Sequence, residues 1–118
     1  MTDERSHLTL SKTDGVTVVQ FTDPNILDEL AISEIGDELF GLVDETPPIH
    51  LLVSFKNVEH LSSAALGMLI TLKNKVDKRS GTLKLSDITS QIFEVFRITQ
   101  LNKLFQIYDT TEQALKAF

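Results

Sequence analysis

The sequence predicts an α/β fold in which a mixed β-sheet, opened by an N-terminal hairpin, packs against helices. Three observations support this class. β-branched runs flank a turn sequence at 8–21, later apolar runs at 49–55, 83–85 and 105–108 have the length of strands, and helical periodicity fills the segments around them. The predicted order is β-β-α-β-α-β-α-β-α, and strands joined through helices make the sheet mostly parallel.

The chain opens with two strands, and the turn sequence TDG between them is typical of a hairpin. Pro24 and Asn25 then interrupt the pattern, and a helix follows. Apolar residues at helical spacing define the buried face expected for that helix: Leu27, Ala31, Ile35, Leu39 and Leu42. Pro47 ends the helix, because proline cannot continue its hydrogen-bond ladder.

The strand at 49–55 is predicted to be covered on both faces, because its apolar run is nearly continuous. A second helix follows two adjacent serines, and we expect it to end at Gly81 with a left-handed cap. Its predicted apolar face consists of Ala65, Leu69, Leu72 and Val76. The predicted core therefore includes Leu51, Leu52, Val53, Leu69 and Leu72.

A third helix is predicted within 86–101, with Ile92, Val95 and Phe96 on its apolar face. Phe93 falls beside that face, and we expect it to be a core residue at the edge of the stripe. The last helix begins near 109–111, where either Asp109 or Thr110 can act as its N-cap. The length of 118 residues predicts a single domain over 1–118.

The formal net charge of −6 argues against a nucleic-acid or anionic-membrane surface, since both require clustered Lys and Arg. A local basic group, Lys73, Lys75, Lys78 and Arg79, is explained by the dipole at a helix C-terminus. The absence of cysteine excludes disulfides and thiol chemistry, and no apolar run reaches the length of a membrane span. We expect a cytoplasmic protein that is a monomer or a weak homodimer.

The residues favour no enzymatic site, cofactor or metal. No glycine-rich phosphate loop or nucleophile elbow occurs, and the three histidines, His7, His50 and His60, lack metal-ligand spacing. His60 precedes Ser62 and Ser63, so a small hydrolase with a histidine base stays an alternative. No orienting acid or oxyanion motif accompanies it, and a solvent-facing loop histidine is the simpler interpretation.

The sequence HLSSAALG, residues 60–67, places two hydroxyls where a strand leads into a helix. One serine suffices to cap the helix, because its oxygen satisfies a free amide of the first turn. The second would face solvent at the positive helix end, where a phosphate is tolerated. The loop at 22–25, with Asp23 and Asn25, and the helix start at Asp28 follow another strand and can lie on the same rim. The simpler interpretation is that Asp23 and Asn25 form a turn and Asp28 opens the helix.

The length, the element order and the stretch LSSAALG resemble the STAS domain of bacterial anti-sigma-factor antagonists. In that family the loop reads D-S-[ST]-G-L-G or a variant such as I-S-S-A-G-L. Alignment gives Ser63 the place of the phosphoacceptor, Ser62 that of the Asp and Ala65 that of the Gly, whereas Leu66 and Gly67 match. The resemblance implies that the chain binds an anti-sigma kinase and is released by phosphorylation of Ser63.

The partner-binding residues expected from the rim and the resemblance together are Asp23, Asn25, Asp28, His60, Ser62, Ser63, Ala64 and Gly67. An alternative function within the same family is an unphosphorylated scaffold that binds a partner or assembles with other STAS proteins. These alternatives differ in whether Ser63 is ever phosphorylated.

Overall fold

The N-terminal hairpin forms as the sequence predicts. The structure is a computed structural model that describes residues 2–4, 7–45 and 48–118. Strands β2 (Leu8–Thr13) and β3 (Val16–Phe21) pair antiparallel. Asp14 and Gly15 between them both have positive φ, 51° and 82°, which is the backbone of a type I′ turn.

One mixed sheet results, with the order β1-β2-β3-β5-β7-β8. Strands β5 (His50–Ser54), β7 (Thr82–Ser86) and β8 (Gln106–Tyr108) continue from β3 in parallel. Strand β1 (Thr2–Glu4) pairs antiparallel with β2, so it lies outside the hairpin, which the sequence placed at the edge of the sheet. Because β3, β5 and β7 are parallel, the loops that follow them emerge at one edge.

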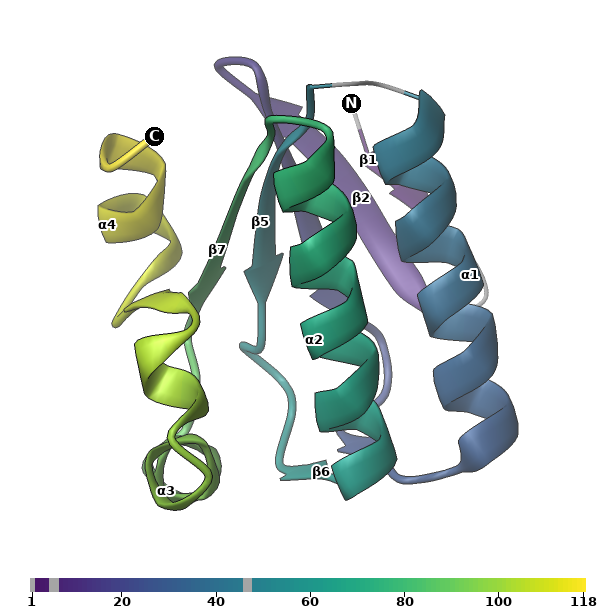
Figure 1. Ribbon diagram of the computed structural model, residues 1–118, viewed down its shortest axis with the longest axis vertical. Helices are drawn as coiled ribbons and strands as arrows, with labels where there is room; N and C mark the ends of the chain where they lie inside the picture. Colours follow the sequence, from purple (N-terminus) through teal and green to yellow (C-terminus); the bar gives the residue numbers. More distant parts are fainter. Residues whose placement is uncertain (1, 5–6, 46–47) are drawn as a thin grey trace.

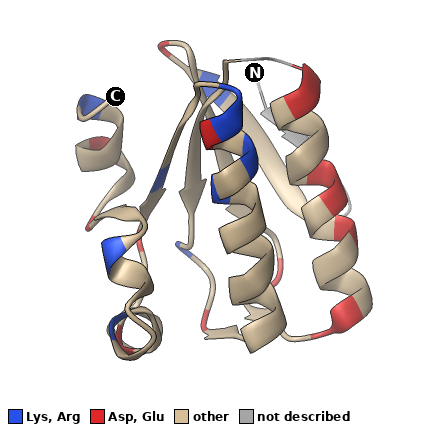
Figure 2. Cartoon of the chain, viewed as in Figure 1, with Lys and Arg blue, Asp and Glu red and all other residues tan. Residues whose placement is uncertain are grey.

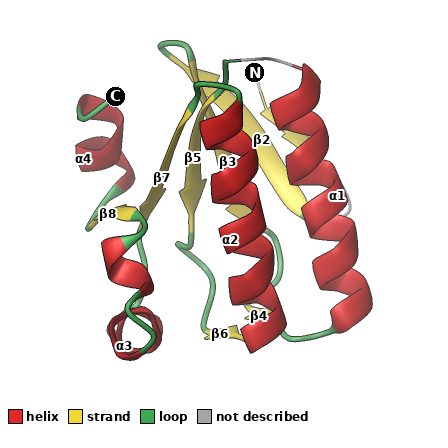
Figure 3. Cartoon of the chain, viewed as in Figure 1, coloured by secondary structure: helices red, strands yellow, loops and turns green. Residues whose placement is uncertain are grey.

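Four helices and one 3₁₀ turn complete the order of elements in the described residues. They are α1 (Glu29–Glu45), α2 (Ser63–Lys78), α3 (Ser90–Ile98), η1 (Leu101–Lys103) and α4 (Thr111–Lys116). Helices α1 and α2 lie side by side in front of the sheet, and both begin at its lower edge in Figure 1. Figure 3 shows the alternation of strand and helix that places these helix starts on one rim.

The hydrophobic core is divided by the sheet into two layers. Leu51 and Val53 belong to the larger cluster with α1, α2 and α3, whereas Leu52 belongs to a smaller cluster with Val18 and Ala114 of α4. All five predicted core residues, Leu51, Leu52, Val53, Leu69 and Leu72, are at most 1% exposed. The prediction that the central strand is covered on both faces is therefore confirmed.

The predicted stripe of α1 was wrong at its first two residues, Leu27 and Ala31, the second of which is only half-buried. Leu27 is 52% exposed and precedes the helix. The carboxylate of Asp28 accepts a hydrogen bond from the Ala31 amide at 3.0 Å, so the helix begins only at Glu29. The residues that the helix buries are Ile32, Ile35, Gly36, Leu39, Leu42 and Val43.

The end of α2 also differs from the prediction, because Ser80 takes the left-handed conformation expected for Gly81, with φ 59°. The amides of Ser80 and Gly81 bond to the carbonyls of Asp77 and Val76 at 3.1 and 2.9 Å, which is a Schellman motif. Gly81 is required for another reason: a Cβ there would collide with the carbonyl oxygen of Ile49. The glycine permits close packing rather than a left-handed turn.

Helix α3 buries less than the sequence predicts. Ile92 and Phe96 are buried, but Val95 is 40% exposed and Phe93 is 37% exposed. Phe96 packs edge-on against two other rings, and the short helix touches the core along this one line, so the residues flanking it face solvent. At α4, the structure selects Thr110 as the N-cap, because its hydroxyl accepts from the Gln113 amide at 3.1 Å.

Candidate functional site

The loop after β3 and the serine loop lie against each other, as expected. Strand β4 (Asn25–Ile26) pairs in parallel with β6 (His60–Leu61), with Asn25 opposite His60. The carbonyl of Pro24 accepts from the Glu59 amide at 2.7 Å, and that of Ile26 accepts from the Ser62 amide at 3.0 Å. We call residues 23–28 and 59–64 the serine rim. These backbone bonds join the starts of α1 and α2 into one surface.

The two serines have different positions. Ser62 is the N-cap of α2, with extended backbone (φ −87°, ψ 166°), and its hydroxyl accepts from the Ala65 amide at 3.2 Å. Ser63 is the first residue of the helix and is exposed. Capping is thus satisfied by Ser62, and the Ser63 hydroxyl is accessible at the positive end of a 16-residue helix.

The acidic residues of the rim are bonded to local backbone. Asp23 accepts from the Asn25 amide at 3.0 Å, which forms a turn around Pro24. Asp28 caps α1 through the Ala31 amide, as described above. Asp23, Asn25 and Asp28 are nevertheless exposed, so the rim that they form is open to a partner.

His60 lies beside the serines without the geometry of a catalytic base. It is exposed, and within the described part of the chain no hydrogen bond joins it to a serine or a carboxylate. It lines a shallow depression of about 150 Å³ with residues of α3, among them Gln91 and Val95. A search of the described residues finds no group of three or more His, Asp or Glu side chains that could hold a metal ion.

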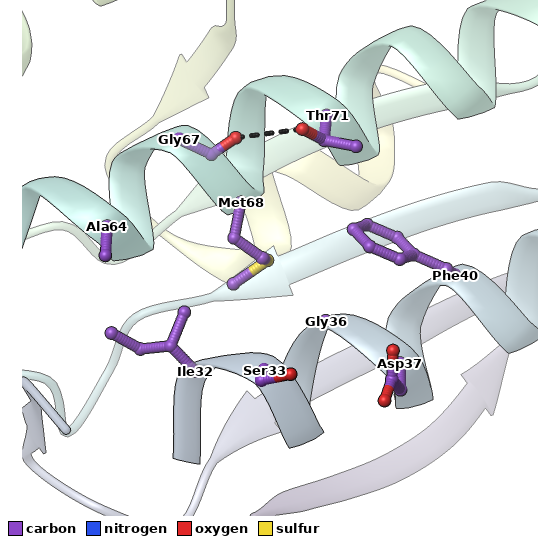
Figure 4. Close-up of a pocket in the computed structure, with 9 residues that line it drawn as sticks. All are labelled: Ile32, Ser33, Gly36, Asp37, Phe40, Ala64, Gly67, Met68 and Thr71. Carbon is purple, nitrogen blue, oxygen red and sulfur yellow. Dashed lines mark hydrogen bonds between the residues drawn. The ribbon is translucent and has the colours of Figure 1, made fainter. Parts of the chain in front are cut away.

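Ala64 and Gly67 lie on an exposed flank of α2 and line a groove against α1. Figure 4 shows this groove, which has a volume of about 280 Å³, with side chains of the two helices pointing into it. The facing residues of α1 are Ile32, Ser33, Gly36, Asp37 and Phe40. Sequence reasoning missed this side of the site, since only the packing of two helices brings the facing residues together. The small residues on α2 were the available signal.

Charge is distributed unevenly over the rim and its surroundings. Helix α1 has no Lys or Arg, and its acidic residues are Glu29, Glu34, Asp37, Glu38, Asp44 and Glu45. Figure 2 shows these carboxylates along α1, whereas the Lys and Arg of α2 gather at its far end. The pKa of Glu94 on α3 is lowered, chiefly by its hydrogen bonds from Arg97, on a helix face outside the serine rim. Helix α1 therefore makes its side of the serine rim negatively charged.

A mixed sheet whose central strands are parallel, with helix starts and an exposed hydroxyl on one rim, defines an α/β domain with a candidate interaction surface. The sequence matches the family model of the STAS domain over residues 7–114. The chain therefore belongs to the STAS domain family, and its fold is that of the anti-sigma-factor antagonists. No helix in the described residues has the length and apolar character needed to cross a membrane.

Known relatives agree with this assignment. The anti-sigma F factor antagonist of Paenibacillus polymyxa is 24% identical over 66 residues, which span 56% of this chain and 56% of that protein. The match thus covers about half of the relative's length. The family assignment depends on the match of the STAS domain model to residues 7–114 and not on this shorter alignment.

Solved structures share the fold over nearly the whole chain. A STAS domain protein from Planctomyces limnophilus superposes with a TM-score of 0.85 at 19% identity, covering 93% of this chain and 96% of that one. An anti-sigma factor antagonist from Mycobacterium paratuberculosis gives 0.81 at 26% identity, covering 93% and 91%. The phosphorylated form of Bacillus SpoIIAA gives 0.70 at 14% identity, covering 93% and 97%.

Proposed function

We propose that this chain acts in the cytoplasm as an anti-sigma-factor antagonist, binding an anti-sigma factor with serine-kinase activity, and that phosphorylation of Ser63 weakens this binding. The observation on which the proposal depends is the division of roles between two serines. Ser62 caps α2, and Ser63 is exposed beside it. A kinase can therefore modify Ser63 without removing the cap on which the helix start depends.

The helix start would tolerate a phosphate. A phosphoserine adds about −1.5 to −2 charge, and a helix N-terminus stabilises such a group. The domain is therefore expected to stay folded when Ser63 is modified. SpoIIAA, a protein of the same fold, has been solved in a phosphorylated form, which supports this expectation.

The surroundings of Ser63 explain why a phosphate would weaken binding. Exposed apolar groups lie on and beside the same rim: Leu27, on the rim, is 52% exposed, and Leu30, in the first turn of α1, is 69% exposed. Leu27 follows β4 directly, and Ser63 lies two residues after β6. Because β4 and β6 are paired in parallel, Leu27 and Ser63 follow the same ends of two adjacent strands. A hydrated dianion beside such apolar contacts disrupts an interface, because binding would have to remove its water.

The departures from the family motif fit the local structure. Ser62 stands where the family has Asp, and both residue types are favoured N-caps. Ala65 stands where the family has Gly, but it lies within the helix and is fully buried, a position suited to alanine. These substitutions therefore leave the capped start of α2 intact.

An unphosphorylated scaffold that binds another STAS protein is the second candidate, and the missing Asp before Ser63 favours it. In either case we infer no enzymatic activity and no cofactor, because His60 lacks an orienting partner in the described residues. The small hydrolase is the least supported alternative.

Co-purification from the native host, with mass spectrometry of the captured proteins and of this chain, tests the proposal. We expect an anti-sigma factor of the kinase type among the partners, and a phosphate on Ser63 in a fraction of the molecules. Capture of other STAS proteins without any phosphate on Ser63 would instead favour the scaffold.

A further inference from the structure

The groove between α1 and α2 begins one residue beyond Ser63 and is open to solvent. Its apolar lining comes from both helices: Ile32, Gly36, Phe40, Ala64 and Met68. Beside Gly67 an added Cβ would meet no atom within 4 Å, so a side chain from outside can approach the helix backbone there. At about 280 Å³ the groove is below the range of about 300–1,000 Å³ typical of small-molecule pockets. It has the size for one or two side chains of a protein partner.

The shape of this groove suits a helix. Two adjacent helices form its banks, and an amphipathic helix binds such a groove through apolar residues spaced three or four apart. Leu30 lies seven residues before Asp37 on α1, hence on the same side of the helix, and is 69% exposed. It extends the apolar surface toward the serine rim.

The banks differ in charge. Asp37 lines the groove, and Glu29 lies eight residues earlier on the same side of α1. Within the described part of the chain neither makes an ion pair, whereas Glu34 approaches His7 and Asp44 binds Arg79. The facing half of α2, residues 63–72, has no charged side chain. A positively charged occupant therefore complements the α1 bank.

A second copy of this chain does not meet that requirement. It would bring another net charge of −6. Three cations at the end of α2 already have contacts: Lys73 with Asp77 at 2.6 Å, Arg79 with Asp44 at 3.1 Å, and Lys75 over the ring of Phe40. A basic segment of a different protein is therefore the better match to the acidic side of the groove.

We propose that the α1–α2 groove binds a basic amphipathic helix of the partner, with apolar side chains entering beside Gly67 and Lys or Arg meeting Asp37 and Glu29. This inference deepens the proposed function and rests on it for the identity of the partner. It also assigns two separate parts to the interface: the groove supplies affinity and charge selection, and Ser63 at its end controls access.

A synthetic helical peptide with Leu on one face and Lys on the other is the probe, and the same peptide with Glu for Lys is its control. Titration into ¹⁵N-labelled protein should shift the amide signals of Gly36, Ala64 and Gly67. The Lys peptide should bind and the Glu peptide should not. If both peptides bind equally, or if shifts avoid the groove, the inference is wrong.

Two pairs of variants make the test specific. Gly67→Leu fills the groove, and Gly41→Leu is its matched control, because an added Cβ at Gly41 also meets open space, on α1 outside the groove. Asp37→Lys changes the bank, and Glu112→Lys makes the same charge change on α4. The first member of each pair should raise the Kd of the Lys peptide about tenfold, equivalent to about 1.4 kcal/mol. The control should leave it within about twofold. Equal effects within a pair would overturn the inference.

The native partner separates this inference from the phosphorylation switch. If Ser63→Asp weakens that partner and Gly67→Leu does not, the groove is not the docking site and the proposed function stands. If Gly67→Leu weakens it and Ser63→Asp does not, the groove is supported and the switch fails. Unchanged binding in both variants would exclude both assignments.

Discussion

Helices α2 and α3 begin in nearly the same way, yet only α2 begins on the serine rim. Ser62 caps α2 by accepting from the Ala65 amide at 3.2 Å, and Thr89 caps α3 by accepting from the Ile92 amide at 3.2 Å. An exposed serine follows each cap, Ser63 or Ser90. A hydroxyl cap followed by serine is therefore a general way to start a helix, and does not by itself identify a regulatory site.

The difference lies in what surrounds each start. Helix α2 has 16 residues, and its first turn borders β4, β6 and the groove with α1. Helix α3 has nine residues, and its Gln91 and Val95 border the depression beside His60. Ser90 itself lines a different hollow, with Phe93 and Tyr108 among others. A third start, at α4, has Thr110 as cap and Thr111 turned inward, donating to Asp87 at 2.6 Å. A hydroxyl cap followed by a second hydroxyl residue thus occurs at three helix starts, and the three differ in which surface or buried group surrounds the second hydroxyl.

The largest expected effect concerns the sheet on which the starts of α2 and α3 depend. Leu52→Ala should lower the free energy of unfolding by about 2–5 kcal/mol, because Leu52 is fully buried between the sheet and α4. Leu30→Ala, at a leucine that is 69% exposed, is the matched control and should cost less than about 0.5 kcal/mol. Denaturant unfolding of both variants checks this. Similar costs would mean that Leu52 is not a core residue.

The inward-facing start at α4 should not accept negative charge. Thr111 donates to the same carboxylate oxygen of Asp87 that accepts from Ser54 and Ser86 at 3.0 and 2.8 Å. Thr111→Asp removes that donor and adds a like charge, so it should destabilise by at least about 1–3 kcal/mol. Ser90→Asp, at an exposed position, should not. Thermal unfolding that ranks Ser90→Asp as the worse variant would contradict this assignment.

The caps of α2 and α3 should be equivalent in stability, although only one lies at the proposed interface. Ser62→Ala and Thr89→Ala should each cost about 0.5–2 kcal/mol, because each leaves a first-turn amide without its acceptor. Chemical denaturation of the two variants measures this. A Ser62→Ala variant as stable as the parent would show that Ser62 is free for another role.

The smallest effect is expected at His60. We predict that neither the parent nor His60→Ala hydrolyses esters and that the variant keeps its fold, because no described residue hydrogen-bonds to the exposed ring. Assays of generic ester substrates with parent and variant check this. Hydrolysis by the parent that disappears in the variant would restore the hydrolase alternative.

Local patterns in the sequence were sufficient to predict most of the elements. The hairpin, the buried central strand and a hydroxyl cap at α2 follow from turn residues, apolar runs and capping preferences, which act within a few residues. The exposures of Leu27 and Val95 did not follow, because the Asp28 cap starts α1 after Leu27 and α3 meets the core along one line. The left-handed conformation of Ser80 was not predicted, because glycine adopts positive φ most readily and the cap was therefore assigned to the neighbouring Gly81.

The candidate site was predicted in part for the same reason. The serine loop and the loop at 22–25 could be placed on one rim, since parallel strands end at the same edge of a sheet. The groove could not be predicted, because Gly36 and Phe40 meet Gly67 and Met68 only when α1 and α2 pack. The sequence thus predicted which edge of the sheet each loop follows, but it did not predict which faces of α1 and α2 pack against each other.

The central claim, that the surroundings of Ser63 and not its local pattern make it a control point, is tested by one binding titration. Purified native partner is titrated with Ser63→Asp and with Ser90→Asp, which place the same charge after equivalent caps. We predict a Kd at least about tenfold higher for Ser63→Asp than for the parent, equivalent to about 1.4 kcal/mol, and an unchanged Kd for Ser90→Asp. Equal Kd values for the two variants would contradict the account.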